Sequence, residues 1–163
     1  MAGKEHALGA TGREVMGNVK RARGEMTYAE LSRRLADVGR PIPPLGLRRI
    51  EAGDRRVDVD DLMALALVLN VSPLSLLLPH GRQSEEGDLA GNRVSNAQLW
   101  KWAVGEKPLG EVTVLRFQAD SLPSWFKVKS STSKAEGKVE RSQFTMSGLK
   151  MPWNPKAQSD GDH

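Results

Sequence analysis

Two pairs of adjacent arginines have the residue type and spacing best suited to binding a polyanion. Arg48 and Arg49 stand in the segment PLGLRRIEAG, and Arg55 and Arg56 stand in DRRV. A guanidinium group can donate two parallel hydrogen bonds to a guanine edge in the major groove, or it can bind a phosphate. Arg48 and Arg49 are therefore candidates for reading bases, with a phosphate contact or a surface ion pair as their alternative roles.

The sequence offers little for catalysis or metal binding. It contains no cysteine, which excludes disulfides, thiolate metal sites and thiol nucleophiles. Its three histidines, His6, His80 and His163, lie outside the patterned segments and lack the spacing of metal ligands. No nucleophile, base and orienting group recur together. We therefore expect a protein that is not an enzyme and that has no metal or cofactor.

The charge distribution favours an anionic partner near the arginine pairs. The net charge is +4, and residues 20–56 hold ten Lys or Arg against five Asp or Glu, a local excess of five. A solvated helical surface would show a similar charge run, so charge alone does not decide. No apolar run approaches the roughly 20 residues that span a bilayer, and no secretory leader is evident. We expect a soluble, cytoplasmic protein.

Helix starts are marked by a short polar residue followed three positions later by an acid, the pattern of a capping box. The three pairs are Thr11 with Glu14, Thr27 with Glu30, and Asp58 with Asp61. Behind each cap, apolar residues recur at steps of three and four, which predicts helices with one buried face. Those residues are Val15, Val19, Ala22, Tyr28, Leu31, Leu35, Leu62, Leu65, Ala66 and Leu69.

Prolines mark the two remaining helix starts in the first half of the chain. Pro44 suits a first helical turn, and Leu47 would anchor that helix to the core while Arg48 faces outward. Ser72 and Pro73 form the same kind of start for a short helix that Pro79 ends. The sequence thus predicts an all-α N-terminal domain of five short helices in residues 11–79.

Residues 26–79 resemble the lambda-repressor-like, XRE-type helix-turn-helix family of bacterial and phage transcriptional regulators. The matching segments are MTYAELS for the start of the second helix, LRRIEAGDRRV for the third helix, which is the recognition helix, and its following loop, and LMALALVLNVSPLSLL for the last two helices. The resemblance implies a five-helix bundle whose third helix docks in the major groove of DNA.

The resemblance also implies a role for individual residues. Thr27 and Tyr28 would approach a phosphate at the start of the second helix. Four residues would enter the major groove: Pro44, Leu45, Arg48 and Arg49. Glu51 would brace the scaffold, Gly53 would close the recognition helix, and both Arg55 and Arg56 would contact the DNA backbone.

The chain departs from the family pattern in four places. Tyr28 stands where glutamine is common, and Ser32 replaces an alanine at the helix crossing. The turn from Leu35 to Pro43 is several residues longer than usual. Gly46 lies inside the recognition helix, where glycine costs about 1 kcal/mol relative to alanine.

The second half of the chain carries weaker patterns. The polar segment HGRQSEEGDLAGN predicts a linker over residues 80–93. Ser95 is expected to cap a helix that ends near Val104, and the alternation from Glu111 to Gln118 predicts a β-strand. Together they would form a small helix-plus-strand element over residues 94–129. A flexible N-terminus is expected over residues 1–10 and a largely disordered tail over residues 130–163.

The strand needs a partner, either residues 125–129 or the same strand of a second subunit, so a homodimer through the C-terminal region is expected. The function expected is a sequence-specific regulator, most simply a repressor, that binds double-stranded DNA. The alternative is a protein-interaction adaptor that keeps the helical fold without reading DNA, a hypothesis motivated by the long turn and Gly46. Neither reading involves a membrane.

Overall fold

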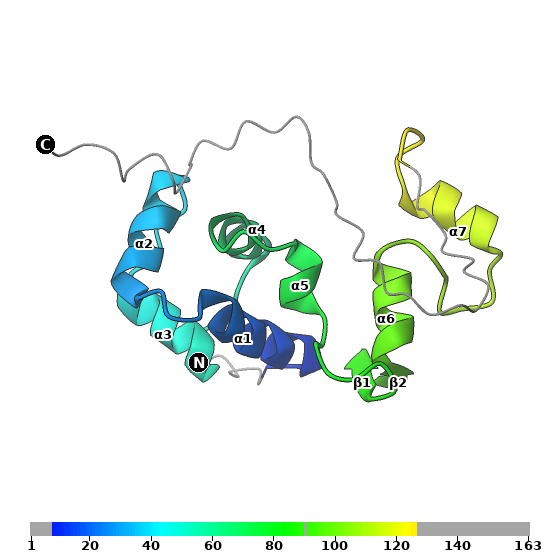
Figure 1. Ribbon diagram of the computed structural model, residues 1–163, viewed down its shortest axis with the longest axis horizontal. Coiled ribbons are helices and arrows are strands. Elements are labelled where there is room, and N and C mark those ends of the chain that lie inside the picture. Colours follow the sequence, from blue (N-terminus) through cyan, green and yellow to red (C-terminus); the bar gives the residue numbers. More distant parts are fainter. Residues whose placement is uncertain (1–7, 90, 127–163) are drawn as a thin grey trace, which may run out of the picture. The chain divides into compact units, whose positions relative to one another are not determined.

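The computed structural model describes residues 8–89 and 91–126 (Figure 1). The tail predicted for residues 130–163 and most of the flexible segment predicted for residues 1–10 lie outside the described residues. Within the described ranges, no helix is both long and apolar enough to cross a membrane.

Five helices form where the sequence predicted them, and we call residues 10–77 the five-helix region. They are α1 (Ala10–Arg23), α2 (Tyr28–Asp37), α3 (Pro44–Ala52), α4 (Val59–Val68) and α5 (Pro73–Leu77). Helices α2 and α3 pack against each other, and α1 contacts both α3 and α5 (Figure 1). An all-α N-terminal part is therefore observed.

Local caps explain most of the helix starts. Thr27 Oγ1 accepts a hydrogen bond from the Glu30 backbone N–H at 3.2 Å, and Asp58 Oδ1 accepts one from the Asp61 N–H at 2.7 Å. The cap predicted at Thr11 is wrong, because the N-cap of α1 lies two residues earlier, at Gly9, and has no side-chain cap bond. The extended backbone of Gly9 allows the chain to enter α1 without a capping side chain.

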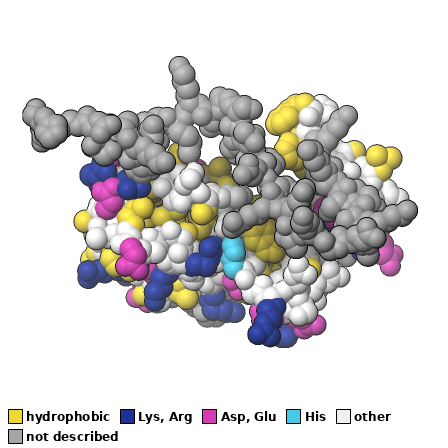
Figure 2. All heavy atoms as spheres, viewed as in Figure 1, with side chains coloured by type: hydrophobic (Ala, Val, Ile, Leu, Met, Phe, Trp, Pro, Cys, Tyr) yellow, Lys and Arg dark blue, Asp and Glu magenta, His cyan; other side chains and the backbone are white. Residues whose placement is uncertain are grey.

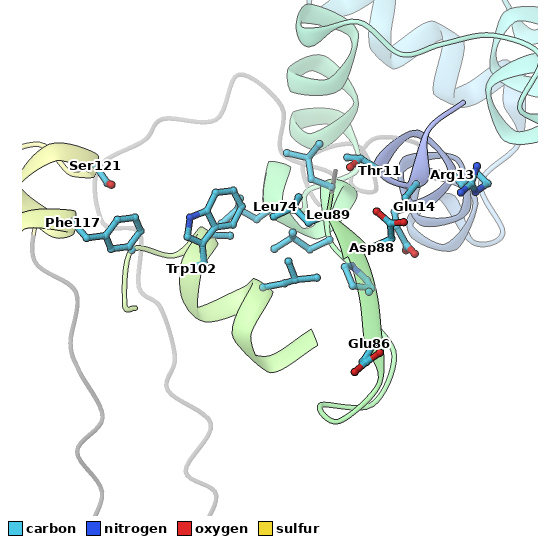
Figure 3. A pocket seen from close by; sticks show the side chains of 18 of the residues that line it. Thr11, Arg13, Glu14, Leu74, Glu86, Asp88, Leu89, Trp102, Phe117 and Ser121 are labelled. Carbon is cyan, nitrogen blue, oxygen red and sulfur yellow. The ribbon is translucent and has the colours of Figure 1, made fainter. Parts of the chain in front are cut away.

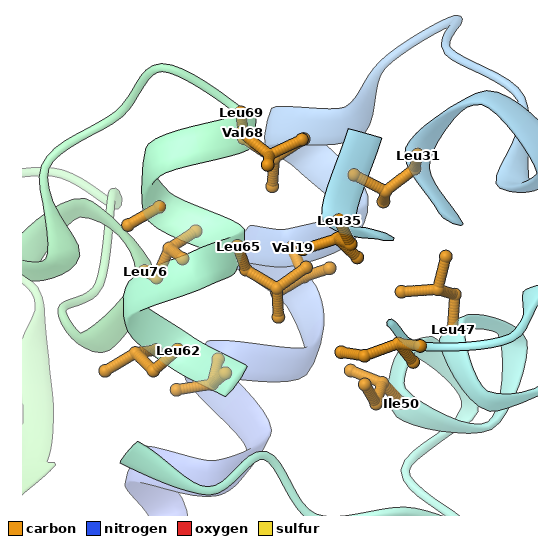
Figure 4. Close-up of a cluster of buried hydrophobic side chains, with 13 residues drawn as sticks. Val19, Leu31, Leu35, Leu47, Ile50, Leu62, Leu65, Val68, Leu69 and Leu76 are labelled. Atoms are coloured by element: carbon orange, nitrogen blue, oxygen red, sulfur yellow. The ribbon is translucent and has the colours of Figure 1, made fainter. Parts of the chain in front are cut away.

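The predicted apolar stripes meet in one core shared by the five helices (Figure 4). Leu31, Leu35, Leu47 and Leu65 have no exposed surface, and Ile50 is 1% exposed. Asn18 is a polar residue buried beside this core, and its amide donates to the carbonyls of Leu76 and Leu78 at 3.2 and 2.9 Å. These bonds hold the end of α5 against α1.

The linker predicted for residues 80–93 is wrong in its second half, where a two-stranded antiparallel hairpin forms. Its strands are β1 (Glu86–Leu89) and β2 (Asn92–Ser95), with Glu86 opposite Ser95 and Leu89 opposite Asn92. The turn is closed by a hydrogen bond from the Gly91 N–H to Asp88 Oδ1 at 2.8 Å, with Gly91 at φ +84°. Both strands are short and polar, so they lack the apolar alternation that predicts a strand.

The strand predicted for residues 111–118 is also wrong, because α7 (Val114–Ser121) begins within this segment and no strand forms before it. Thr113 Oγ1 caps the helix by accepting from the Arg116 N–H at 3.3 Å. A helix satisfies its own backbone bonds, whereas a lone strand needs a neighbour. The helix predicted after Ser95 is confirmed as α6 (Asn96–Ala103), with a full capping box between Ser95 and Gln98. We call residues 86–121 the C-terminal region.

Candidate nucleic-acid interface

Helix α3 presents two distinct faces. It starts with Pro44 and ends at Gly53, whose left-handed φ of +85° lets its N–H reach back to the last turn. Leu47 and Ile50 face the core. The residues three and four positions apart on the other side are exposed, and they are Leu45, Arg48, Arg49 and Ala52. The predicted division of this helix into an anchoring face and an outward face is confirmed.

Arg48 and Arg49 carry charge that no acid in the described part of the chain offsets. Within the described ranges, neither guanidinium forms an ion pair, and both side chains are exposed. The Arg48 guanidinium carbon lies 5.4 Å from the centre of the Tyr28 ring, within the range of a cation–π contact. The ring therefore holds Arg48 close to the start of α2 and leaves its donors available.

A network of three side chains joins α1, α2 and α3. Arg23 donates to both carboxylate oxygens of Glu51, at 2.7 and 3.0 Å, and the Tyr28 hydroxyl donates to Glu51 Oε2 at 2.8 Å. The Glu51 side chain is 4% exposed. The bracing role that the resemblance implied for Glu51 thus has a geometric basis.

The network shifts the acid–base behaviour of its members. Burial tends to raise the pKa of Glu51, but the hydrogen bonds from Arg23 and Tyr28 outweigh it and the pKa is lowered. The pKa of Tyr28 is raised by its hydrogen bond to Glu51 and by burial. The pKa of Arg23 is raised, mainly by its hydrogen bond to Glu51. Glu51 therefore stays ionised and Tyr28 stays neutral at physiological pH.

The residues predicted to approach a phosphate at the start of α2 differ in their availability. The Tyr28 hydroxyl is already bonded to Glu51 and lies 3.4 Å from Arg23 Nη2, so its main role here is to join helices. Thr27 is exposed and uses its oxygen as an acceptor for the Glu30 N–H, which leaves its hydroxyl hydrogen free to donate. The first backbone N–H groups of a helix have no acceptor within the helix, so the start of α2 is suited to binding an anion.

The long turn between α2 and α3 is anchored rather than loose. Ile42 is 1% exposed and packs in the core, and Ser32 Oγ donates to its carbonyl at 2.7 Å. Gly39 adopts φ +78°, which allows the Arg40 N–H to reach the Leu35 carbonyl at 2.9 Å. The departure from the family pattern at Ser32 thus supplies a bond that holds the longer turn.

A single buried carboxylate binds the segments on both sides of α3. Asp61 Oδ1 accepts from Arg40 Nε at 2.8 Å, and Asp61 Oδ2 accepts from Arg55 Nη2 at 2.8 Å. Asp61 is 2% exposed, while both arginine side chains remain over a third exposed. The pKa of Arg40 is raised, mainly by its hydrogen bond to Asp61. Arg40 also pairs with Asp58 at 2.6 Å.

This pairing changes the prediction for Arg55. Its charge is offset by Asp61, so it is less suited to bind a phosphate than the resemblance implied. The same guanidinium explains Gly46, because a Cβ at that position would lie 2.9 Å from Arg55 Nη1 and 3.1 Å from Ile42 Cγ2. Glycine in α3 makes room for the arginine.

Other arginines in α2 are neutralised locally. Glu30 accepts from Arg33 at 2.9 Å and from Arg34 at 2.6 Å, and these hydrogen bonds lower the pKa of Glu30 to about 2. On the face of the molecule drawn in Figure 2, Lys and Arg side chains are interspersed with Asp and Glu. Among the described arginines of α3, Arg48 and Arg49 form no ion pair with an acid.

Sequence reasoning missed the partners of Asp61 and the amide of Asn18. Asp61 was interpreted only as an acid that favours a helix start, because its arginines lie 21 and 6 residues away. Asn18 interrupts the apolar stripe of α1, and a polar residue at a core position was the available signal.

No family model, curated protein or solved structure matches this chain. The described residues contain no group of three or more His, Asp or Glu that could hold a metal ion.

Proposed function

We propose that this protein is a sequence-specific DNA-binding regulator in which α2, the turn and α3 act as a helix-turn-helix unit. Helix α3 would lie in the major groove, with Arg48 and Arg49 hydrogen-bonded to guanine edges and Leu45 in apolar contact with a base. The observation that carries this proposal is the outward face of α3, which a helix fixed to the core by Leu47 and Ile50 presents. Two arginines on that face pair with no acid of the described residues.

Phosphate contacts would fix the register of the helix on the duplex. The start of α2, with the Thr27 hydroxyl and the first backbone N–H groups of the helix, supplies one such contact, and Arg56 after α3 supplies another. The modest positive charge near these residues is compatible with a salt-dependent association. Binding at a promoter would exclude polymerase, which is why we propose repression.

We also propose a homodimer. The strand expected at residues 111–118 does not support it, because helix α7 forms there instead. A dimer that binds DNA symmetrically would require two half-sites about 34 Å apart, one helical turn of the duplex.

Selection of bound duplexes from a random pool tests the function directly. We expect an enriched motif, with guanines at the positions nearest Arg48 and Arg49, and binding that survives competitor DNA and weakens steeply as salt rises. Two motif copies in inverted orientation would indicate a dimer. If the selected pool remains random at every salt concentration, the proposal is wrong.

An interaction adaptor is the second candidate, and one observation favours it. Val59, Met63 and Leu67, spaced four apart on α4, form an apolar row whose members are 75%, 56% and 44% exposed. Such a row suits contact with another protein. An adaptor would show no preferred DNA sequence in the same selection. The long turn and Gly46, which first motivated this alternative, have structural explanations in Ser32 and Arg55.

A further inference from the structure

A pocket of about 610 Å³ lies where the first turns of α1, helix α5, strand β1 and helices α6 and α7 come together. Its walls are largely apolar, with Leu74 from α5 and Leu89 from β1 facing Trp102 of α6 (Figure 3). Phe117 of α7 points toward Trp102 from the opposite side. The pocket therefore has an aliphatic floor and an aromatic end.

The other end of the pocket is acidic. Glu14 of α1 and Asp88 of β1 both line this end (Figure 3), together with Arg13, whose guanidinium donates to the Leu8 carbonyl at 2.7 Å. Glu86 also lines the pocket but is paired with Arg93 at 3.0 Å. Within the described ranges, neither Glu14 nor Asp88 forms an ion pair, and Asp88 Oδ1 accepts only the Gly91 N–H.

We propose that this pocket binds a small organic cation with an apolar body. The two carboxylates, which form no ion pair among the described residues, would attract the positive charge of the ligand at one end. Trp102 and Phe117 at the other end would contact its body, and their ring faces favour a body over which positive charge is spread. The apolar walls would cover the body of the ligand, as in most small-molecule sites. The site is separate from α3, so it does not depend on the proposed reading of DNA.

Two ions of equal shape and opposite charge test this site in the full chain. Tetraphenylphosphonium is a hydrophobic cation and tetraphenylborate is its anionic counterpart, and titration calorimetry measures the binding of each. We expect saturable binding of one phosphonium per chain and weaker binding of the borate, although the net protein charge of +4 favours the anion. Equal or tighter binding of the borate overturns the proposal.

Variants locate the binding and keep the test informative if one of them is unstable. The double variant Glu14→Gln with Asp88→Asn preserves size and the turn acceptor, and it should weaken phosphonium binding about fivefold. Trp102→Ala should weaken it about tenfold. Glu25→Gln, an exposed acid outside the pocket, is the matched control and should change nothing.

The folded state of each variant is checked by circular dichroism and urea unfolding. Unchanged phosphonium affinity in both folded variants contradicts the proposal. A wild-type dimer in sedimentation that Trp102→Ala converts to a monomer also contradicts it, because the occupant of the pocket is then a second copy of the chain.

Discussion

The five-helix region and the C-terminal region differ in how much apolar surface they bury. The five-helix region places thirteen buried residues in one core, whereas α6 contributes the buried Leu99 and no residue of α7 is buried. A shared core constrains side chains along the whole length of each helix that lines it. Elements without a core are constrained mainly at their ends, by caps and turn residues. The two regions should therefore respond very differently to equivalent substitutions.

The largest difference is expected for leucine truncations. Leu65→Ala removes a side chain with no exposed surface from the centre of the core, and it should lower the free energy of unfolding by about 2–5 kcal/mol. Leu115→Ala in α7 changes a leucine that is 81% exposed, and it should cost less than about 0.5 kcal/mol. Urea unfolding measures both. Similar losses for the two variants would remove the contrast between the regions.

Ion pairs should show the same contrast. Asp61→Ala leaves Arg40 and Arg55 without their shared buried acid, and it should lower the free energy of unfolding by about 2 kcal/mol, a value reduced for the partial exposure of both arginines. Glu86→Ala breaks the exposed pair with Arg93 in the hairpin and should change stability by less than about 0.5 kcal/mol. Thermal and urea unfolding of the two variants provide the comparison.

DNA binding should depend on exposed arginines of one region only. Arg48→Ala should relax specificity at one base pair by about 1–3 kcal/mol, while Arg56→Ala should weaken all sequences alike and reduce the salt slope by about one. Arg116→Ala in α7, which is exposed and paired with Asp120, is the matched control and should leave binding unchanged. Gel-shift titrations on selected and random duplexes separate these outcomes. Equal losses for all three variants would refute the assigned roles.

Acid should weaken the five-helix region through Glu51. The pKa of Glu51 is lowered in the folded state, so its contribution to stability is present above its ordinary value of 4.5 and is lost as the pH falls through the folded pKa. The raised pKa of Tyr28 acts at the other limit, since that contribution is lost as the pH rises above 10.0 toward the folded pKa.

Glu51→Gln should therefore lose less stability than the wild type between pH 7 and pH 3. Urea unfolding at several pH values measures this slope. A slope as steep as that of the wild type would show that Glu51 does not control the acid response.

The smallest effect concerns two helical glycines within the five-helix region. Gly17→Ala in α1 meets no atom within 4 Å and should stabilise the protein by about 1 kcal/mol through helix propensity. Gly46→Ala in α3 must displace Arg55 and Ile42, so the same gain should be largely cancelled. Thermal unfolding of the pair measures the difference. An equal gain at both positions would show that Arg55 moves aside without cost.

Prediction from sequence succeeded where local and periodic signals agreed. Thr27, Asp58 and Ser95 are recognisable as caps. The apolar stripes after Thr27 and Asp58 line the core, and Leu99 after Ser95 is buried. It failed over residues 86–95 and 111–118, because short exposed elements carry no apolar period that separates strand from helix. Thr113 has the residue type of a cap, but the alternation of Val112 and Val114 around it favours a strand.

The candidate interface was predictable in its residues but not in its supports. The outward position of Arg48 follows from the spacing of Leu47 and Ile50. The bond from Arg23 to Glu51 spans 28 residues, and periodicity does not encode contacts of that separation. The ion pair between Arg55 and Asp61 could not be predicted from periodicity either, because it depends on where α4 packs.

Asp61 gives α3 a property that reaches beyond stability. One carboxylate holds Arg40 before the helix and Arg55 after it, so both ends of α3 are fixed to α4. A helix held in this way loses little conformational entropy when it meets a partner, since it is already preorganised in the free protein. Loosening either arginine should therefore slow productive association even where every contacting side chain remains in place.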